Sequence, residues 1–139
     1  MSSLLVVADY VLDLLQNDGS LDLQDVWYGD QELIPRVPCV TIEPTSVESN
    51  LAGIPFMLEN QLSISIMVYY GGIRDTQISK RDSIAYAQNV ISALHADKTM
   101  GGNVIHSFCT GVEHGVAAKN STLIFASRLT WSGLTKTQE

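Results

Sequence analysis

The chain has 139 residues, 45% of them hydrophobic and 17% charged, which fits one globular domain over 1–139 rather than a disordered chain. Its formal net charge of −7, from 15 acidic and 8 basic residues, argues against binding nucleic acid by neutralising phosphates. The apolar runs are too short to span a bilayer and no secretory signal pattern is visible, so we expect synthesis in the cytosol.

The first predicted element is a helix over residues 3–16. Leu4, Ala8 and Val11 belong to an apolar stripe with spacings of three and four residues, which is typical of a helix with one buried face. Residues 17–36 are acidic, aromatic and rich in turn-forming residues. This composition predicts an ordered loop.

Two strands are predicted on either side of an irregular segment. Val37–Glu43 has strand composition and is closed by Pro44. Gln61–Tyr70 alternates apolar and polar residues, which predicts a strand with one face on a core. Residues 45–59 show neither a helical nor a strand period, so we expect a protruding arm there. A second helix is predicted over Asp75–Ala96.

The remaining predicted elements are two strands, Val104–Val116 and Thr122–Trp131, with a hairpin turn near Lys119-Asn120. Residues 132–139 are polar, and we expect a flexible tail. The order is therefore helix, two strands, helix, two strands. It predicts an α+β fold in which one layer of about two helices packs on a mostly antiparallel sheet of about four strands.

Residues that could carry chemistry are few and widely spaced. His106 and His114 could share a face of one predicted strand, but at strand rise they would lie about 26 Å apart, too far to bind one ion. Cys39 and Cys109 are expected to be buried thiols. Neither GxGxxG nor GxxxxGK[ST] occurs. We therefore predict no catalytic residue, no metal site and no cofactor.

The predicted arm carries four large apolar residues without a regular period: Leu51, Ile54, Phe56 and Met57. Contiguous exposed apolar surface usually marks a protein contact. The arm could fold back over the edge of its own sheet, or it could pack on a neighbouring subunit. In the second case, Phe56→Asp is expected to abolish oligomers and to leave the monomer folded.

The run from Tyr28 to Pro44, in which two prolines precede a strand that ends in Glu-Pro, resembles a block of the phage tail terminator and tail-completion proteins. The later elements are similar in their order. They are the alternating strand Gln61–Tyr70, a long helix, a Gly-Gly turn, and two closing strands with Val112–Gly115 midway. The resemblance covers nearly the whole chain and is one of pattern, since this family has no catalytic signature.

The resemblance implies a structural virion protein, made and assembled in the host cytoplasm, that forms a ring at the head-proximal end of a phage tail. Such rings are usually hexamers that end polymerisation of the tail tube and dock the head connector. The implied partners are further copies of the chain, the tail tube protein, the head–tail connector or stopper protein and, in contractile tails, the sheath. DNA would pass through the lumen without specific binding, and no membrane would be involved.

On this interpretation the apolar arm packs on a neighbouring subunit, and four polar residues contact the tube or connector: Asp25, Asp30, Glu32 and Arg36. Charge reversal at Arg36 is expected to weaken docking more than folding. Three alternatives remain open. They are another neck ring, such as a head-completion or stopper protein, a small metal-dependent or hydrolytic enzyme, and a monomeric ligand-binding module.

Overall fold

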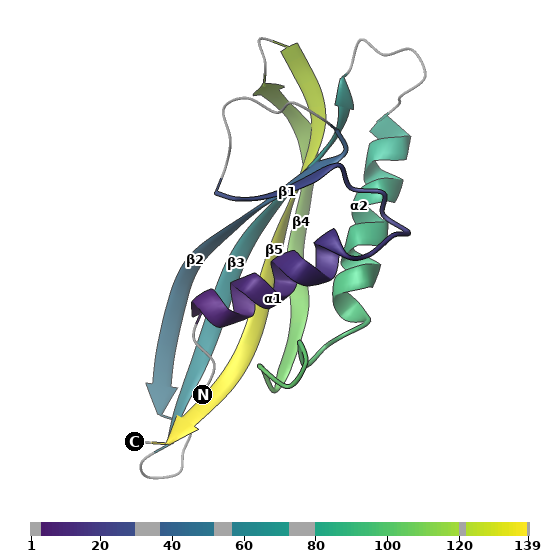
Figure 1. The fold of residues 1–139 in the computed structure, drawn as a ribbon. Helices are drawn as coiled ribbons and strands as arrows, with labels where there is room; N and C mark the ends of the chain where they lie inside the picture. The colour runs from purple at the N-terminus through teal and green to yellow at the C-terminus, as the bar shows by residue number, and fades with distance from the viewer. Residues whose placement is uncertain (1–3, 30–36, 52–56, 73–79, 120–121, 139) are drawn as a thin grey trace.

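A computed structural model describes residues 4–29, 37–51, 57–72, 80–119 and 122–138. In chain order the elements are α1 (Leu4–Gln16), β1 (Asp25–Tyr28), β2 (Cys39–Leu51), β3 (Met57–Gly72), α2 (Lys80–His95), β4 (His106–Lys119) and β5 (Thr122–Gln138). The two helices pack on one face of the five-stranded sheet (Figure 1). This arrangement confirms the predicted α+β architecture, with β1 as an additional strand.

The strand order in the sheet is β1-β2-β3-β5-β4, so β5 lies between β3 and β4. β1 pairs with β2 in parallel, and the other three pairings are antiparallel. The register shifts at three places: between Pro44 and Ser46, between Tyr69 and Gly71, and between Cys109 and Gly111. Each shift is a bulge, which changes the face to which the following side chains point.

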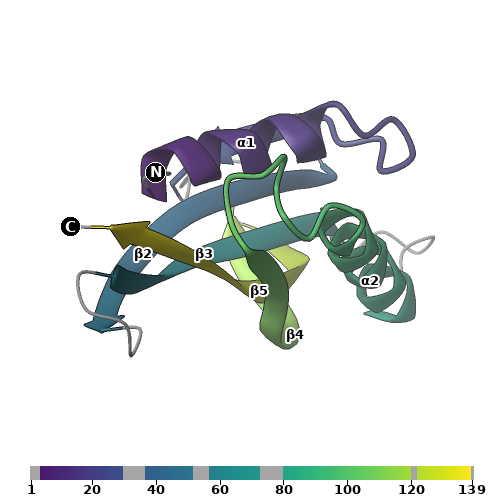
Figure 2. The ribbon, with the colours of Figure 1, turned by 90° about the horizontal axis from the view of Figure 1, so that it is seen from below.

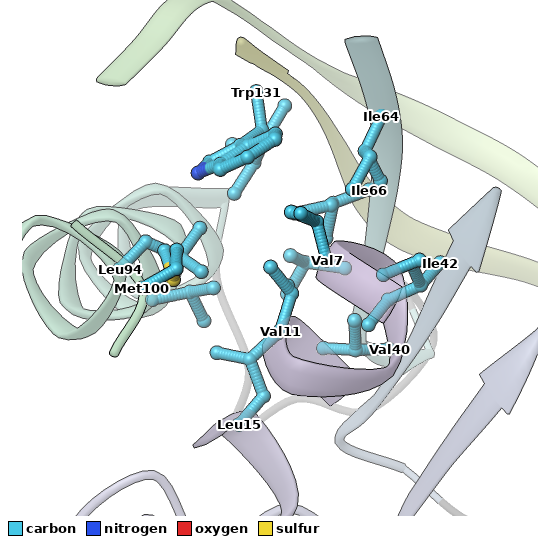
Figure 3. Close-up of a cluster of buried hydrophobic side chains, with 14 of the residues drawn as sticks. Val7, Val11, Leu15, Val40, Ile42, Ile64, Ile66, Leu94, Met100 and Trp131 are labelled. Carbon is cyan, nitrogen blue, oxygen red and sulfur yellow. The ribbon is translucent and has the colours of Figure 1, made fainter. Parts of the chain in front are cut away.

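The main core lies between the helices and the sheet, as Figure 3 shows. α1 contributes Val7, Val11 and Leu15, which are fully buried because they form the apolar stripe of the helix. Leu94 of α2 and Trp131 of β5 are also fully buried in this cluster. Burying each of the aliphatic side chains stabilises the fold by about 1.5–3 kcal/mol.

The connection between α2 and β4 is fastened to α1. Asp97 accepts hydrogen bonds from the hydroxyl of Tyr10 at 2.5 Å and from the backbone N–H of Gly101 at 3.2 Å. Met100 and Gly101 both have positive φ angles, 47° and 66°. This turn directs the Met100 side chain into the core, where it is fully buried.

The predicted loop over 17–36 contains the short strand β1, which was missed. Val26, Trp27 and Tyr28 are residues that favour strands. Parallel pairing with Cys39–Ile42 of β2 supplies the hydrogen bonds that a strand of this length cannot provide alone. Residues 30–36 lie outside the described part of the chain.

The prediction of an irregular arm over 45–59 is wrong for its described residues. β2 continues past Pro44 to Leu51 and pairs with β3, which begins at Met57, to form a long hairpin (Figure 1). Proline is tolerated because the register shifts directly after it and because β1 covers β2 only as far as Ile42. Residues 52–56 lie outside the described residues.

The end of the chain also differs from the prediction. A flexible tail was expected from residue 132, but β5 continues to Gln138 and pairs with the first residues of β3. Polar residues can form a strand here because the neighbouring stretch of β3 provides a partner for each of them. α2 lies within the predicted range, although residues 73–79 are outside the described part.

Candidate assembly surface

The two faces of the sheet differ in what covers them. Figure 2 shows that α1 lies across the sheet over β2, whereas α2 lies near β4 and β5. The strand register places Ile42, Ile66, Leu129 and Val112 in one row, and the first three belong to the core under the helices. We call this the helix-covered face. The next row, on the other face, contains Thr41, Met67, Arg128 and Glu113. We call that the open face, although a small second buried cluster with Cys39, Tyr69 and Ala126 lies on part of it.

Three exposed apolar side chains belong to elements at the β2 side of the sheet: Leu5 and Val6 to α1, and Val47 to β2. Leu5 and Val6, in the first turn of α1, are 62% and 49% exposed. Figure 1 shows that α1 begins on the β2 side. Val47 pairs with the core residue Leu62, so it points to the same face, and it is 47% exposed. We call Leu5, Val6 and Val47 the β2-side patch.

A second group lies on the helix-covered face at the opposite edge. Val112 and Val116 of β4 are 43% and 53% exposed, and Leu123 of β5 is 50% exposed. Val116 pairs with Phe125, and Leu123 follows two residues away on the same face of β5. We call Val112, Val116 and Leu123 the β4-side patch. The molecule therefore carries two groups of exposed apolar side chains, one on α1 and β2 and one at the opposite edge of the sheet.

The edge strand β4 is fixed in place by α2. The backbone N–H of Cys109, at the bulge, donates to Nε2 of His95, the last residue of α2, at 3.0 Å. Burial raises the pKa of the Cys109 thiol to about 11, so it stays protonated and unreactive near neutral pH. Cys39 is buried as predicted, whereas Cys109 is only partly buried, and within the described residues neither cysteine forms a disulfide.

The expectation that His106 and His114 could share a face is wrong. His106 pairs with Leu134 and His114 pairs with Ser127, seven residues away on the regular strand β5. Since side chains alternate along a strand, an odd separation places the two histidines on opposite faces. The bulge between Cys109 and Gly111 causes this reversal.

Each of these histidines has a local structural contact. Nδ1 of His114 lies 2.7 Å from the hydroxyl of Ser127 on the adjacent strand. The ring of His106 stacks on Phe108, with ring centroids 6.1 Å apart. Phe108 is 47% exposed and lies on the open face, opposite Ser132.

Two hollows in the surface could be considered as ligand pockets, but one is small and the other is polar. One of about 160 Å³ lies over small residues of β4 and β5, where Glu113 and Arg128 face each other across the strands. Another of about 410 Å³, near the end of α1, is lined by Asp18, Ser20, Asn89, Ser92 and Ala93. Ligand pockets are typically about 300–1,000 Å³ and mostly apolar, and neither hollow meets both criteria.

The predicted contact residues are only partly described. Asp25 is the first residue of β1, pairs with Cys39 and is partly exposed. Leu51 ends β2 and Met57 begins β3, so the structure brings these two to the same end of the hairpin. The other predicted contact residues lie outside the described residues: Asp30, Glu32, Arg36, Ile54 and Phe56.

The sequence patterns did not predict the two apolar patches. A signal for the first exists in the run from Leu4 to Val7, because four consecutive apolar residues cannot all lie on one helical stripe. Val112 and Val116 carry a weaker signal. Their even spacing indicates one face of a strand, but only the sheet order shows that this strand is at an edge.

The chain matches no family model, and it matches no curated protein. Among the described residues, no group of three or more His, Cys, Asp or Glu side chains is placed to hold a metal ion. Within the same ranges, neither helix has the length and apolar character needed to cross a membrane.

Proposed function

We propose that this chain is a structural protein of a phage tail that assembles into a closed ring at the head-proximal end of the tail tube. The ring would end polymerisation of the tube and provide the docking surface for the head or neck connector. The proposal rests on the resemblance of the run Tyr28–Pro44 and of the later element order to tail terminators.

One structural observation carries the assembly part of this proposal. The β2-side patch, on α1 and β2, and the β4-side patch, on β4 and β5, lie at opposite edges of one sheet. Burying apolar area at about 25 cal/mol per Å² favours contact between two such surfaces. When the two surfaces differ, the contact is heterologous, and repeated head-to-tail contacts form a ring if the rotation closes.

Other residues are proposed to make the contacts along the axis of the ring. The run that begins with Asp25 and includes Asp30, Glu32 and Arg36 would face the tube or the connector and set the polar register of docking. Leu51 and Met57, at the end of the long hairpin, would extend the contact toward a neighbouring subunit.

The first experiment is a native mass measurement by light scattering across a concentration series, with and without purified tail tubes. We expect a closed oligomer of about six chains, formed alone or on tube ends. A chain that stays monomeric at all concentrations and ignores tubes would contradict the proposal.

A matched pair of variants tests whether the patches cause assembly. Val116→Asp places a charge in the β4-side patch at a position that is 53% exposed, so it should block assembly and leave the fold intact. Thr130→Asp places the same charge at an exposed position on the open face of β5 and should assemble normally. Binding to tube ends rather than to emptied heads then separates a terminator from another neck ring.

A further inference from the structure

Among the described strands, two sheet edges are open, one along part of β2 and one along β4. We propose that neighbouring copies join edge to edge, with the free part of β2 in one copy paired antiparallel with β4 of the next. One hydrogen-bonded sheet would then continue through every contact. This inference rests on the proposed ring and specifies how its subunits meet.

The described strands leave two backbone edges unpaired. β4 is the last strand in the sheet order, and within the described part of the chain β5 is its only partner strand. At the other side, β1 covers β2 only over Cys39–Ile42, so the stretch from Glu43 to Leu51 has no described strand beyond it. An open edge presents unpaired N–H and C=O groups that can accept another strand.

The directions of the two edges are compatible. β2 is antiparallel to β3, β3 to β5 and β5 to β4, so β2 and β4 run in opposite directions. If the next copy is related by a rotation that keeps the strands roughly along the ring axis, its β2 approaches β4 in an antiparallel orientation. Antiparallel pairing needs no connecting segment and gives well-aligned hydrogen bonds.

The side chains support the same arrangement independently of the backbone. α1 packs on β1 and β2, so a copy whose β2 lies beside β4 brings its α1 into the same layer. Val47 of that copy would then lie beside Val112 or Val116, and the exposed Leu5, at the margin of the buried stripe of α1, would come close to the same patch. Apolar side chains of both patches meet in one contact, and the helical layer continues together with the sheet.

The pairing must be staggered along the strands. Through the register of one copy, Val47 is level with Ser107, and Ile42 is level with Val112. Contact between Val47 and Val112 therefore requires the next copy to move along the strand direction. Tilted, staggered strands are the normal geometry of a sheet that closes on itself.

A two-fold contact between two β4 strands is the main competing arrangement. It would bury the β4-side patch but leave Leu5, Val6 and Val47 exposed in both copies. It would also stop at a dimer, because both copies use the same surface. The head-to-tail contact uses both patches, and for this reason we favour it.

Disulfide cross-linking of the full chain tests the contact. Val47→Cys is combined in one chain with Val112→Cys or with Val116→Cys, and assembled protein is oxidised. One of these double variants is expected to give a ladder of covalent oligomers, since paired strands bring Cα atoms within disulfide range. The native thiols should contribute little, because Cys39 is buried and the Cys109 thiol has a raised pKa.

Matched controls separate the possible outcomes. Val47→Cys with Thr130→Cys, which lies on a central strand, should give no ladder, and an equal mixture of the two single variants should stop at covalent dimers. Rings that form without a ladder in either double variant would overturn the edge pairing and leave the proposed function standing. Covalent dimers of Val112→Cys alone would indicate the two-fold contact instead.

Amide hydrogen exchange distinguishes strand pairing from side-chain packing alone. If the sheet continues through the contact, alternate amides in 45–51 and 111–119 should exchange at least about tenfold more slowly in the ring than in the Val116→Asp monomer. Equal exchange in the two states would overturn the pairing. Failure of the wild-type chain to form any ring, with or without tubes, would contradict the proposed function itself.

Discussion

Gly101 lies in the turn between α2 and β4, next to the ring of Tyr10. Its φ angle is +66°, and a Cβ atom added there would lie 2.7 Å from Cε2 of Tyr10. Gly101→Ala should therefore lower the free energy of unfolding by more than the roughly 1–2 kcal/mol expected for a left-handed residue alone. Urea unfolding measures this change.

Gly102→Ala is the matched control for that substitution. Gly102 also has a positive φ angle, +90°, but an added Cβ would meet nothing within 4 Å. It should show the backbone cost without the steric one. Equal losses in the two variants would mean that the Tyr10 contact does not matter.

Asp97, in the same turn, gives a pH-dependent contribution to stability. The hydrogen bond from Tyr10 is the largest cause that lowers its pKa, followed by the bond from the N–H of Gly101. The folded pKa lies below the unfolded value of 3.8, so the stabilisation is present above that value and is lost as the pH falls below it. Tyr10→Phe should therefore be less stable than wild type near neutral pH, with a difference that shrinks in acid. A constant difference across this range would contradict the assignment.

At the scale of elements, His95 joins the end of α2 to the bulge in β4. His95→Ala removes the acceptor for the Cys109 N–H and should cost about 1–3 kcal/mol, as expected for a partly buried donor left unpaired. His106→Ala is the control, because His106 is exposed and should change stability by less than about 0.5 kcal/mol. Thermal or urea unfolding of both variants compares them, and similar losses would contradict a bridging role for His95.

The elements with a regular period were predictable from the sequence. α1 has an apolar stripe and β3 contains ten alternating residues, so each could be recognised from its own residues. β1 could not be identified with the same rules, because its hydrogen bonds come from β2. The continuation of β2 past Pro44 was hidden by a bulge, which interrupts the alternation that identifies a strand.

The candidate surface was harder to predict than the fold. Val112 and Val116 are exposed because β4 is the edge strand. The sequence does not show that β5 lies between β3 and β4 in the sheet. The faces of His106 and His114 likewise depend on the bulge at Cys109. Local patterns therefore gave the elements, whereas the surface depends on contacts between residues far apart in the chain.

At the scale of the whole molecule, two different patches allow a complementation experiment. Leu5→Asp disables the β2-side patch, and Val116→Asp disables the β4-side patch. Each variant alone should be monomeric, but each retains the surface that the other has lost. An equal mixture should form dimers of two chains and nothing larger, as measured by light scattering. A mixture that stays monomeric would argue against a head-to-tail contact.

The position of β5 also has a consequence for how the chain folds. It follows every other strand in the sequence, yet it lies between β3 and β4, and its partners on β3 are distant in the chain: Gly72 pairs with Ile124, and Met57 pairs with Gln138. Such non-local pairing slows folding. During translation, β3 and β4 cannot join until β5 has left the ribosome, and until then an edge of β3 is open to other nascent chains. Production of this protein in a cell should therefore depend on chaperones that protect the incomplete sheet.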